Sequence, residues 1–114
     1  MPSLINDQKF TQEVLNSDAP VLVHFWAPWC GLCRLIEPAL HHVLQESGSS
    51  LKLVGINADE NLRLASSYHI TNLPTVLLFQ GGKVLDRIDT IPSQRDQLPN
   101  IFRDLLRHTR SYSL

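Results

Sequence analysis

Several features that mark particular classes of protein are scarce or missing in this sequence of 114 residues. Ten Lys and Arg residues are matched by eleven Asp and Glu residues, and the formal net charge of −1 provides no basic surface for nucleic acid or an anionic membrane. No stretch approaches the roughly 18 consecutive apolar residues of a transmembrane helix. The first four residues, Met1 to Leu4, lack the basic start and apolar block of a secretory signal peptide. These absences predict a cytoplasmic protein that binds neither nucleic acid nor a membrane.

Cysteine is scarce as well, since Cys30 and Cys33 are the only two in the chain. Two cysteines are too few for a secreted disulfide scaffold, and in a reducing compartment such a pair usually serves catalysis or metal binding. A structural zinc site needs four ligands, and here only histidines could supply the rest. The candidates lie at the far end of the following helix or at a distance along the chain: His41, His42, His69 and His108. We therefore expect no metal or other cofactor, and a metal bridging two chains remains the alternative.

The sequence around this pair favours redox chemistry. The apolar run of residues 21–26 predicts a central strand, and Trp29-Cys30-Gly31-Leu32-Cys33 follows it at the start of a helix. A helix N-terminus carries partial positive charge and free N–H groups, which stabilise a thiolate placed there. Two residues between the cysteines allow a small disulfide ring that opens and closes reversibly. The pattern indicates thiol–disulfide exchange, with Cys30 nearer to solvent than Cys33.

Hydrophobic periodicity and turn residues predict the order of the other elements. The first half contains a short helix capped by Asn6 or Asp7 with Phe10, Val14 and Leu15 on its apolar side, the strand at 21–26, and a helix from Leu32 that is kinked at Pro38 and ended by residues 48–50. The second half contains a strand at 51–56, a helix at 61–68, strands at 75–79 and 84–88 joined by a turn at 81–82, a final helix from about Leu98, and a loose tail at 108–114. This order predicts one α/β domain over residues 1–114, with a mixed sheet and helices on both faces.

The chain resembles the thioredoxin family over nearly its whole length, from about Leu4 to Leu106. The resemblance rests on Phe25-Trp26-Ala27-Pro28-Trp29-Cys30-Gly31-Leu32-Cys33, Pro38, Asn57-Ala58-Asp59, Leu73-Pro74-Thr75 and Gly82. It implies the thioredoxin fold and a monomeric thiol–disulfide oxidoreductase that acts on protein disulfides. A thioredoxin reductase or another thiol reductant would regenerate it, and the Cys30–Cys33 disulfide itself would carry the electrons.

The resemblance also implies roles for individual residues. Cys30 takes the place of the attacking cysteine, and Cys33 that of the resolving cysteine, which cleaves the mixed disulfide. Pro74 resembles the family's cis-proline, beside which the backbone of Leu73 pairs with an extended substrate segment. The residues expected to contact substrate are Trp29, Gly31, Leu32, Leu73, Pro74 and Thr90. Trp26 is expected to pack in the interior.

The chain departs from the family's usual pattern at four positions. His24 stands where thioredoxins usually have a buried aspartate and Gly55 where they have a buried lysine, a pair that assists proton transfer at the resolving cysteine. Leu32 replaces the proline between the cysteines, and Thr90, or Asp89 in a shifted alignment, replaces a glycine of the partner groove. We expect a less reducing disulfide than usual, because Leu32 adds an N–H near the first sulfur and the buried aspartate is gone. We also expect poor reduction by a conventional thioredoxin reductase.

Two alternatives stay open at the level of sequence. His24 sits mid-strand among apolar neighbours, so it is either a neutral core histidine or the base that accepts a proton from Cys33, in which case the rate should fall below about pH 6. The protein is either an oxidoreductase or a binding module or redox sensor on the same scaffold, with little turnover. The missing charge pair and groove glycine favour the second possibility, and the intact motifs around the cysteines favour the first.

Overall fold

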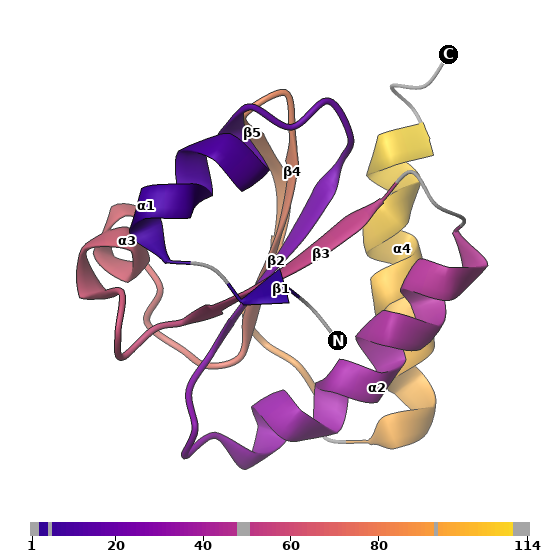
Figure 1. The fold of residues 1–114 in the computed structure, drawn as a ribbon. Coiled ribbons are helices and arrows are strands. Elements are labelled where there is room, and N and C mark those ends of the chain that lie inside the picture. The colour runs from indigo at the N-terminus through magenta and orange to yellow at the C-terminus, as the bar shows by residue number, and fades with distance from the viewer. Residues whose placement is uncertain (1–2, 5, 48–50, 93, 111–114) are drawn as a thin grey trace.

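A five-stranded mixed sheet forms the centre of the computed structural model, which describes residues 3–4, 6–47, 51–92 and 94–110 (Figure 1). The strands are β1 (Ser3–Leu4), β2 (Val21–Trp26), β3 (Lys52–Asn57), β4 (Thr75–Gln80) and β5 (Lys83–Ile88). Their order across the sheet is β1-β3-β2-β4-β5, with β1, β3 and β2 parallel and β4 antiparallel to both of its neighbours. The predicted α/β fold with a mixed sheet is confirmed. The sequence pattern does not predict β1, because two residues are too few to show a period.

Helices cover both faces of the sheet, with α1 and α3 on one side and α2 and α4 on the other (Figure 1). Their bounds are α1 (Asp7–Phe10), α2 (Gly31–Glu46), α3 (Leu62–Ser67) and α4 (Leu98–Arg110). Because successive side chains of a strand point to opposite faces, β2 contributes to two cores. One core, under α1 and α3, includes Phe10, Val14, Val21, Val23, Phe25, Val54, Ile56, Leu64, Leu77 and Phe79. The other, under α2 and α4, includes Leu22, Ile36, Leu40, Val43, Leu53, Val76, Leu78, Leu98, Phe102 and Leu105.

The first helical segment begins as predicted after Asn6, whose side chain accepts a hydrogen bond from the backbone N–H of Lys9 at 3.2 Å. It continues directly into η1 (Thr11–Leu15), a π-helical turn that buries Val14. The pattern of apolar residues predicts a helix here and does not distinguish the wider turn. None of the helices in the described part of the chain is long and apolar enough to cross a membrane.

The helix that carries the cysteines begins one residue before the predicted start, at Gly31, with Cys30 as its N-cap. It runs through Pro38 and changes direction along its length in Figure 1, as expected where a proline removes a backbone hydrogen bond. It ends at Glu46, with Ser47 as the C-cap. The predicted stop signal at residues 48–50 lies outside the described residues.

The last helix shows one correction to the sequence analysis. It follows a 3₁₀ turn, η2 (Arg95–Gln97), and begins at Leu98, so that Pro99 falls in its first turn, where no backbone N–H is needed. It runs to Arg110, and the prediction of a loose tail from residue 108 is therefore wrong for residues 108–110. No glycine or proline follows Leu106 in this segment, and each added residue gains one helical hydrogen bond. The rest of the predicted tail lies outside the described residues.

The hairpin between β4 and β5 turns at Gly81 and Gly82, as predicted. Both have positive φ, at 62° and 79°, which is the combination that a tight turn between twisted strands requires. A Cβ at Gly82 would lie 3.1 Å from the backbone oxygen of Leu15, a tight contact, so the available space also favours glycine there.

Candidate active site

The two cysteines lie where β2 gives way to α2. The chain leaves β2 through a tight turn in which the N–H of Cys30 donates to the carbonyl of Ala27 at 3.1 Å. Cys30 then caps α2: its Sγ accepts a hydrogen bond from the backbone N–H of Cys33 at 3.1 Å. A disulfide joins the two residues, with their Cα atoms 5.3 Å apart. A cysteine at this position receives both the partial positive charge of the helix end and a direct N–H donor.

Both cysteines are largely covered. The exposed fraction is 5% for Cys30 and 2% for Cys33, so the order expected from sequence holds but the difference is small. They form a small apolar cluster with Ala27, against which Trp26, Leu32 and Leu73 pack. The donor to Cys30 Sγ is the N–H of Cys33, one position beyond Leu32, so a proline at position 32 would leave this hydrogen bond in place.

The loop before β4 reaches the cysteines from the neighbouring strand. Leu73 packs against the cysteine cluster, and the peptide bond between Leu73 and Pro74 is cis, as the resemblance implied. The hydroxyl of Thr75 donates to the carbonyl of Asn72 at 2.7 Å and closes this turn. The structure therefore brings together the two motifs that lie 40 residues apart in sequence.

Trp29 is the most exposed aromatic side chain of the site, with 70% of its surface accessible. Its indole Nε1 donates to Oδ2 of Asp59 at 2.8 Å, and the backbone N–H of Asp59 donates to the side chain of Asn57 at 2.9 Å. Asn57-Ala58-Asp59 is one of the motifs that carry the resemblance, but the hydrogen bond between Asp59 and Trp29 is not predicted from sequence. The signal was present, because β2 and β3 are parallel neighbours and their carboxyl ends meet at one edge of the sheet.

Trp26 packs beside the disulfide, as expected, and is only partly exposed. Its indole N–H is buried without a hydrogen-bond partner among the described residues. Gly31 is exposed, and a Cβ built there meets no atom within 4 Å. Gly31 is therefore not required by close packing within the chain.

His24 is buried, with 2% of its surface exposed, on the sheet face that α2 and α4 cover. Neither ring nitrogen has a hydrogen-bond partner in the described part of the chain. Burial lowers the pKa of His24 to about 4, so the ring is neutral at pH 7. The direction agrees with the sequence analysis, and a pKa near 4 moves the expected acid loss of any activity that depends on neutral His24 from about pH 6 toward pH 4.

The register of the sheet explains why the ring of His24 is isolated. His24 pairs with Gly55 in β3 and with Val76 in β4. Residues paired in register share a face, so the two positions at which the chain departs from the family's aspartate and lysine lie side by side. Glycine offers no side chain and valine no polar atom, and the imidazole is left without a neighbour to bond.

Thr90 follows β5 and is exposed, and its hydroxyl lies 3.5 Å from Oδ1 of Asp89. Val76, near the start of β4, pairs with Ile88 at the end of β5, and Thr75 pairs with Phe25 near the end of β2. The end of β5 is therefore at the same edge of the sheet as the cysteines and Pro74. The topology places Thr90 at the expected edge.

The described residues contain no group of three or more His, Cys, Asp or Glu side chains that could hold a metal ion.

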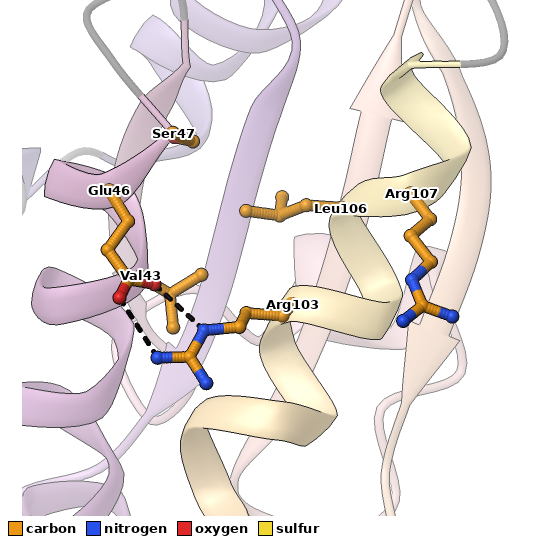
Figure 2. A pocket seen from close by; sticks show the side chains of 6 residues that line it. All are labelled: Val43, Glu46, Ser47, Arg103, Leu106 and Arg107. Atoms are coloured by element: carbon orange, nitrogen blue, oxygen red, sulfur yellow. Dashed lines mark hydrogen bonds and ion pairs between the residues drawn. The ribbon is translucent and has the colours of Figure 1, made fainter.

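A cavity of about 310 Å³ lies at the other end of α2, between that helix and α4 (Figure 2). Arg103 spans its wall with two hydrogen bonds to the carboxylate of Glu46, at 2.8 and 2.9 Å, and holds the pKa of that carboxyl below its ordinary value. Neither cysteine lines this cavity.

Comparison with known proteins agrees with this geometry. The family model described as Thioredoxin matches residues 2–103. Thioredoxin 1 of Nostoc sp. is 46% identical over 84 residues, which cover 74% of this chain and 78% of the relative. The thioredoxin of Porphyra purpurea is 46% identical over 89 residues, which cover 78% of this chain and 80% of the relative. The thioredoxin of Griffithsia pacifica is 38% identical over 109 residues, covering 96% of each chain. With a disulfide at the start of α2 and a cis-proline loop packed against it, this chain belongs to the thioredoxin family and is a protein disulfide oxidoreductase.

Proposed function

We propose that this protein reduces disulfides in other proteins, with Cys30 as the nucleophile and Cys33 as the resolving cysteine. The observation that supports this assignment is the hydrogen bond from the N–H of Cys33 to Cys30 Sγ in the first turn of α2. A hydrogen bond to an anion is stronger than one to a neutral sulfur, so this donor favours the Cys30 thiolate once the disulfide is open. Cys33 is slightly more buried than Cys30, which supports its assignment as the second cysteine to react.

The exchange proceeds in two displacements. The Cys30 thiolate attacks one sulfur of the substrate disulfide, the substrate S–S bond breaks, and the departing sulfur takes up a proton. Cys33 then gives up its proton, attacks the Cys30 sulfur of the mixed disulfide and releases the second substrate thiol. The substrate gains two electrons and two protons, and the Cys30–Cys33 disulfide forms again. A thioredoxin reductase or another dithiol supplies two electrons for the next cycle.

The substrate segment binds, in this proposal, along the surface beside the disulfide. The backbone of Leu73 pairs with an extended segment of the substrate, since Leu73 packs on the cysteine cluster. The residues that would flank this segment are Trp29, Gly31, Leu32, Pro74 and Thr90. The hydrogen bond of Trp29 to Asp59 keeps the exposed indole in one orientation for that contact.

The disulfide is proposed to be less reducing than that of a usual thioredoxin. A neutral His24 takes the place of a buried carboxylate that would oppose a nearby thiolate. Leu32 also carries an N–H that a proline would lack. Both differences favour the thiolate, which is the reduced form, and a more stable reduced form makes the disulfide a better oxidant. Because the observed donor to Cys30 is Cys33, we assign the larger share of the effect to His24.

His24 is our candidate for the group that accepts the Cys33 proton, directly or through a water. It is neutral and on the face that α2 covers, but a base with a pKa of about 4 is weak, and no hydrogen bond joins it to Cys33. Its contribution to the rate is therefore small. The alternative function is that of a binding module or redox sensor with little turnover. The lack of a charged pair at His24 and Gly55 favours this alternative.

Reduction of insulin disulfides by dithiothreitol tests the proposal. Catalytic amounts of the wild-type protein should accelerate the reaction, and Cys30→Ser should give no acceleration. An unaccelerated reaction with the wild type would contradict turnover on protein disulfides and support the binding-module alternative. Cys33→Ser should retain a partner through Cys30, and partners trapped in this way identify the physiological substrates.

We further propose that the chain acts as a monomer and a single domain over residues 1–114, in the cytoplasm, without a cofactor and without binding nucleic acid or a membrane. The common sheet supports the single domain, since all five strands belong to it and the two cores pack on its two faces. The balanced composition, with a net charge of −1, supports the expectation about nucleic acid.

A further inference from the structure

One guanidinium group is hydrogen-bonded to two segments that lie next to residues of the proposed substrate-binding surface. Arg87, near the end of β5, donates from Nη1 to the carbonyl of Tyr68 at 2.6 Å and from Nη2 to the carbonyl of His69 at 2.7 Å. Its Nε donates to Oδ2 of Asp89 at 3.1 Å. The side chain is 30% exposed, so these bonds form in a partly desolvated position. Sequence analysis does not single out Arg87.

The two carbonyl groups are available because of the way α3 ends. His69 has a positive φ of 54°, and its N–H donates to the carbonyl of Ser66 at 3.1 Å, while the N–H of Ile70 donates to the carbonyl of Ala65 at 2.9 Å. This pair of bonds is a Schellman motif, formed here without glycine. It occupies the carbonyl groups of Ala65 and Ser66, and those of Tyr68 and His69 accept from Arg87 instead. A guanidinium, whose donors lie in a fixed planar fork, can donate to both carbonyl groups at once.

The chain that leaves this helix end reaches Leu73 within four residues. Ile70 packs against the core under α3, and Thr75 holds the carbonyl of Asn72, so the segment of residues 69–73 is fixed at its start by Arg87 and at its end by Thr75. On the other side, Asp89 is next to Thr90. The same guanidinium is therefore hydrogen-bonded to the start of the segment that leads to Leu73 and to the residue before Thr90.

We propose that Arg87 is a positioning residue that sets the spacing between the segment of residues 69–73 and that of residues 89–90, and thereby the fit of an extended protein substrate. The proposal rests on the proposed function, in which Leu73 and Thr90 contact the substrate. Arg87 takes no part in the exchange between sulfur atoms. Its removal should weaken the recognition of protein disulfides and leave the reaction with a small disulfide unchanged.

The test compares Arg87→Leu, Arg87→Lys and wild type on two substrates, insulin and the small aromatic disulfide 5,5′-dithiobis(2-nitrobenzoic acid). Arg87→Leu should raise KM for insulin about fivefold, the change that follows from losing roughly 1 kcal/mol of binding. Its kcat for insulin and its rate with the small disulfide should stay within about twofold. Arg87→Lys keeps the charge but not the fork, and should show a similar rise in KM. Arg63→Leu, which removes an exposed cation on α3, is the matched control and should leave all three values unchanged.

Two patterns would overturn the proposal: an unchanged KM for insulin in Arg87→Leu, or equal losses on both substrates in both Arg87 variants. Amide hydrogen exchange provides a readout that does not depend on activity. Exchange should accelerate together in residues 69–73 and 89–90 of Arg87→Leu, and acceleration in only one segment, or in neither, would contradict the coupling. If the wild type fails to reduce insulin, the proposed function fails, and the exchange data still decide the role of Arg87.

Discussion

The outer and inner parts of the redox site differ in how much polar support the fold gives them. In the outer part, the Cys30 sulfur accepts an N–H from the first turn of α2, and Trp29 is hydrogen-bonded to Asp59. In the inner part, both nitrogens of His24 lack a partner among the described residues, and the adjacent position is Gly55. In the proposed mechanism, the fold would therefore support the attack by Cys30 and offer little to the proton transfer at Cys33.

This difference has a kinetic consequence. A thiol in apolar surroundings gives up its proton reluctantly, because burial disfavours the charged form. The mixed disulfide should form at an ordinary rate, since its nucleophile is well supported, and should be resolved slowly. We expect the second displacement to limit turnover in this protein. The outer and inner parts of the site should also respond differently to substitution, and the expected effects run from a loss of activity of about a thousandfold down to a change in KM of about threefold.

The largest effect separates the two cysteines. Cys30→Ser should lower insulin reduction by at least about a thousandfold, because it removes the nucleophile. Cys33→Ser should also stop turnover but accumulate a mixed disulfide through Cys30, which mass spectrometry of the intact protein detects. In the reduced wild type, limiting iodoacetamide should label Cys30 first. Preferential labelling of Cys33 would reverse the assignment of the two roles.

The second effect is a loss of stability in acid that comes from the inner part of the site. The pKa of His24 is about 4 in the folded protein and 6.5 in a model peptide, so the unfolded chain binds the proton first as the pH falls. Above about pH 6.5, the titration of His24 does not lower the free energy of unfolding. Between pH 6.5 and pH 4 it lowers that free energy by about 3 kcal/mol, for a shift of this size. Urea unfolding of the oxidised protein between pH 7 and pH 4 measures this loss.

His24→Leu should remove that portion of the pH dependence, since leucine does not titrate. His69→Asn is the control, because His69 is exposed and asparagine tolerates its left-handed backbone conformation. The free energy of unfolding of His69→Asn should change with pH as that of the wild type does. Identical pH dependence in wild type and His24→Leu would show that the burial of the ring has no energetic consequence.

A third prediction adds a base to the inner part. His24→Asp places a carboxylate where the neutral ring now lies and should speed the resolution of the mixed disulfide about tenfold, within the range of general base catalysis. His24→Asn has nearly the same shape without the charge and should leave the rate unchanged. Single-turnover decay of a mixed disulfide between Cys30 and a chromophoric thiol measures the step directly. Equal acceleration by both variants would refute proton transfer as the limiting factor.

The parts of this structure that sequence analysis predicts are those set by local pattern. The apolar run of β2, the helical period that begins after the cysteines and the Gly81-Gly82 turn are all written in neighbouring residues, and the structure has them at the predicted places. β1 escapes prediction because it exists only through its pairing with Val54 and Gly55 of β3. A two-residue edge strand carries no period of its own.

The parts of the site that escape prediction are contacts between residues far apart in sequence. The bond of Trp29 to Asp59 spans 30 positions, and the bonds of Arg87 to Tyr68 and His69 span 19 and 18. The pKa of His24 is of the same kind, since it depends on which residues the neighbouring strands place beside the ring. Sequence alone indicates a low value and cannot say how low, because solvation is a property of the folded interior.

A fourth prediction compares the two substitutions that should influence the reduction potential. His24→Asp should make the disulfide more reducing by about 30 mV, because a nearby carboxylate destabilises the thiolate and ~30 mV corresponds to ~1.4 kcal/mol. Leu32→Pro should act in the same direction by only about 10–15 mV, because the Cys33 donor remains. Equilibration with glutathione buffers measures both. If Leu32→Pro is as oxidising as the wild type or more so, the N–H of Leu32 does not act on the Cys30 sulfur.

The smallest effect concerns the rim of the outer part, where Thr90 follows β5. Thr90 is exposed at the end of the sheet that carries the cysteines, and we propose that its side chain hinders the close approach of a partner's backbone, which a glycine would allow. Thr90→Gly should lower KM for a conventional thioredoxin reductase about threefold, a gain of roughly 0.6 kcal/mol, and leave dithiothreitol-driven insulin reduction unchanged. Thr90→Ala retains the Cβ and should gain less than Thr90→Gly. An equal gain in both variants would assign the obstruction to the hydroxyl and methyl groups, and full activity of the wild type with that reductase would show that residue 90 does not obstruct the partner at all.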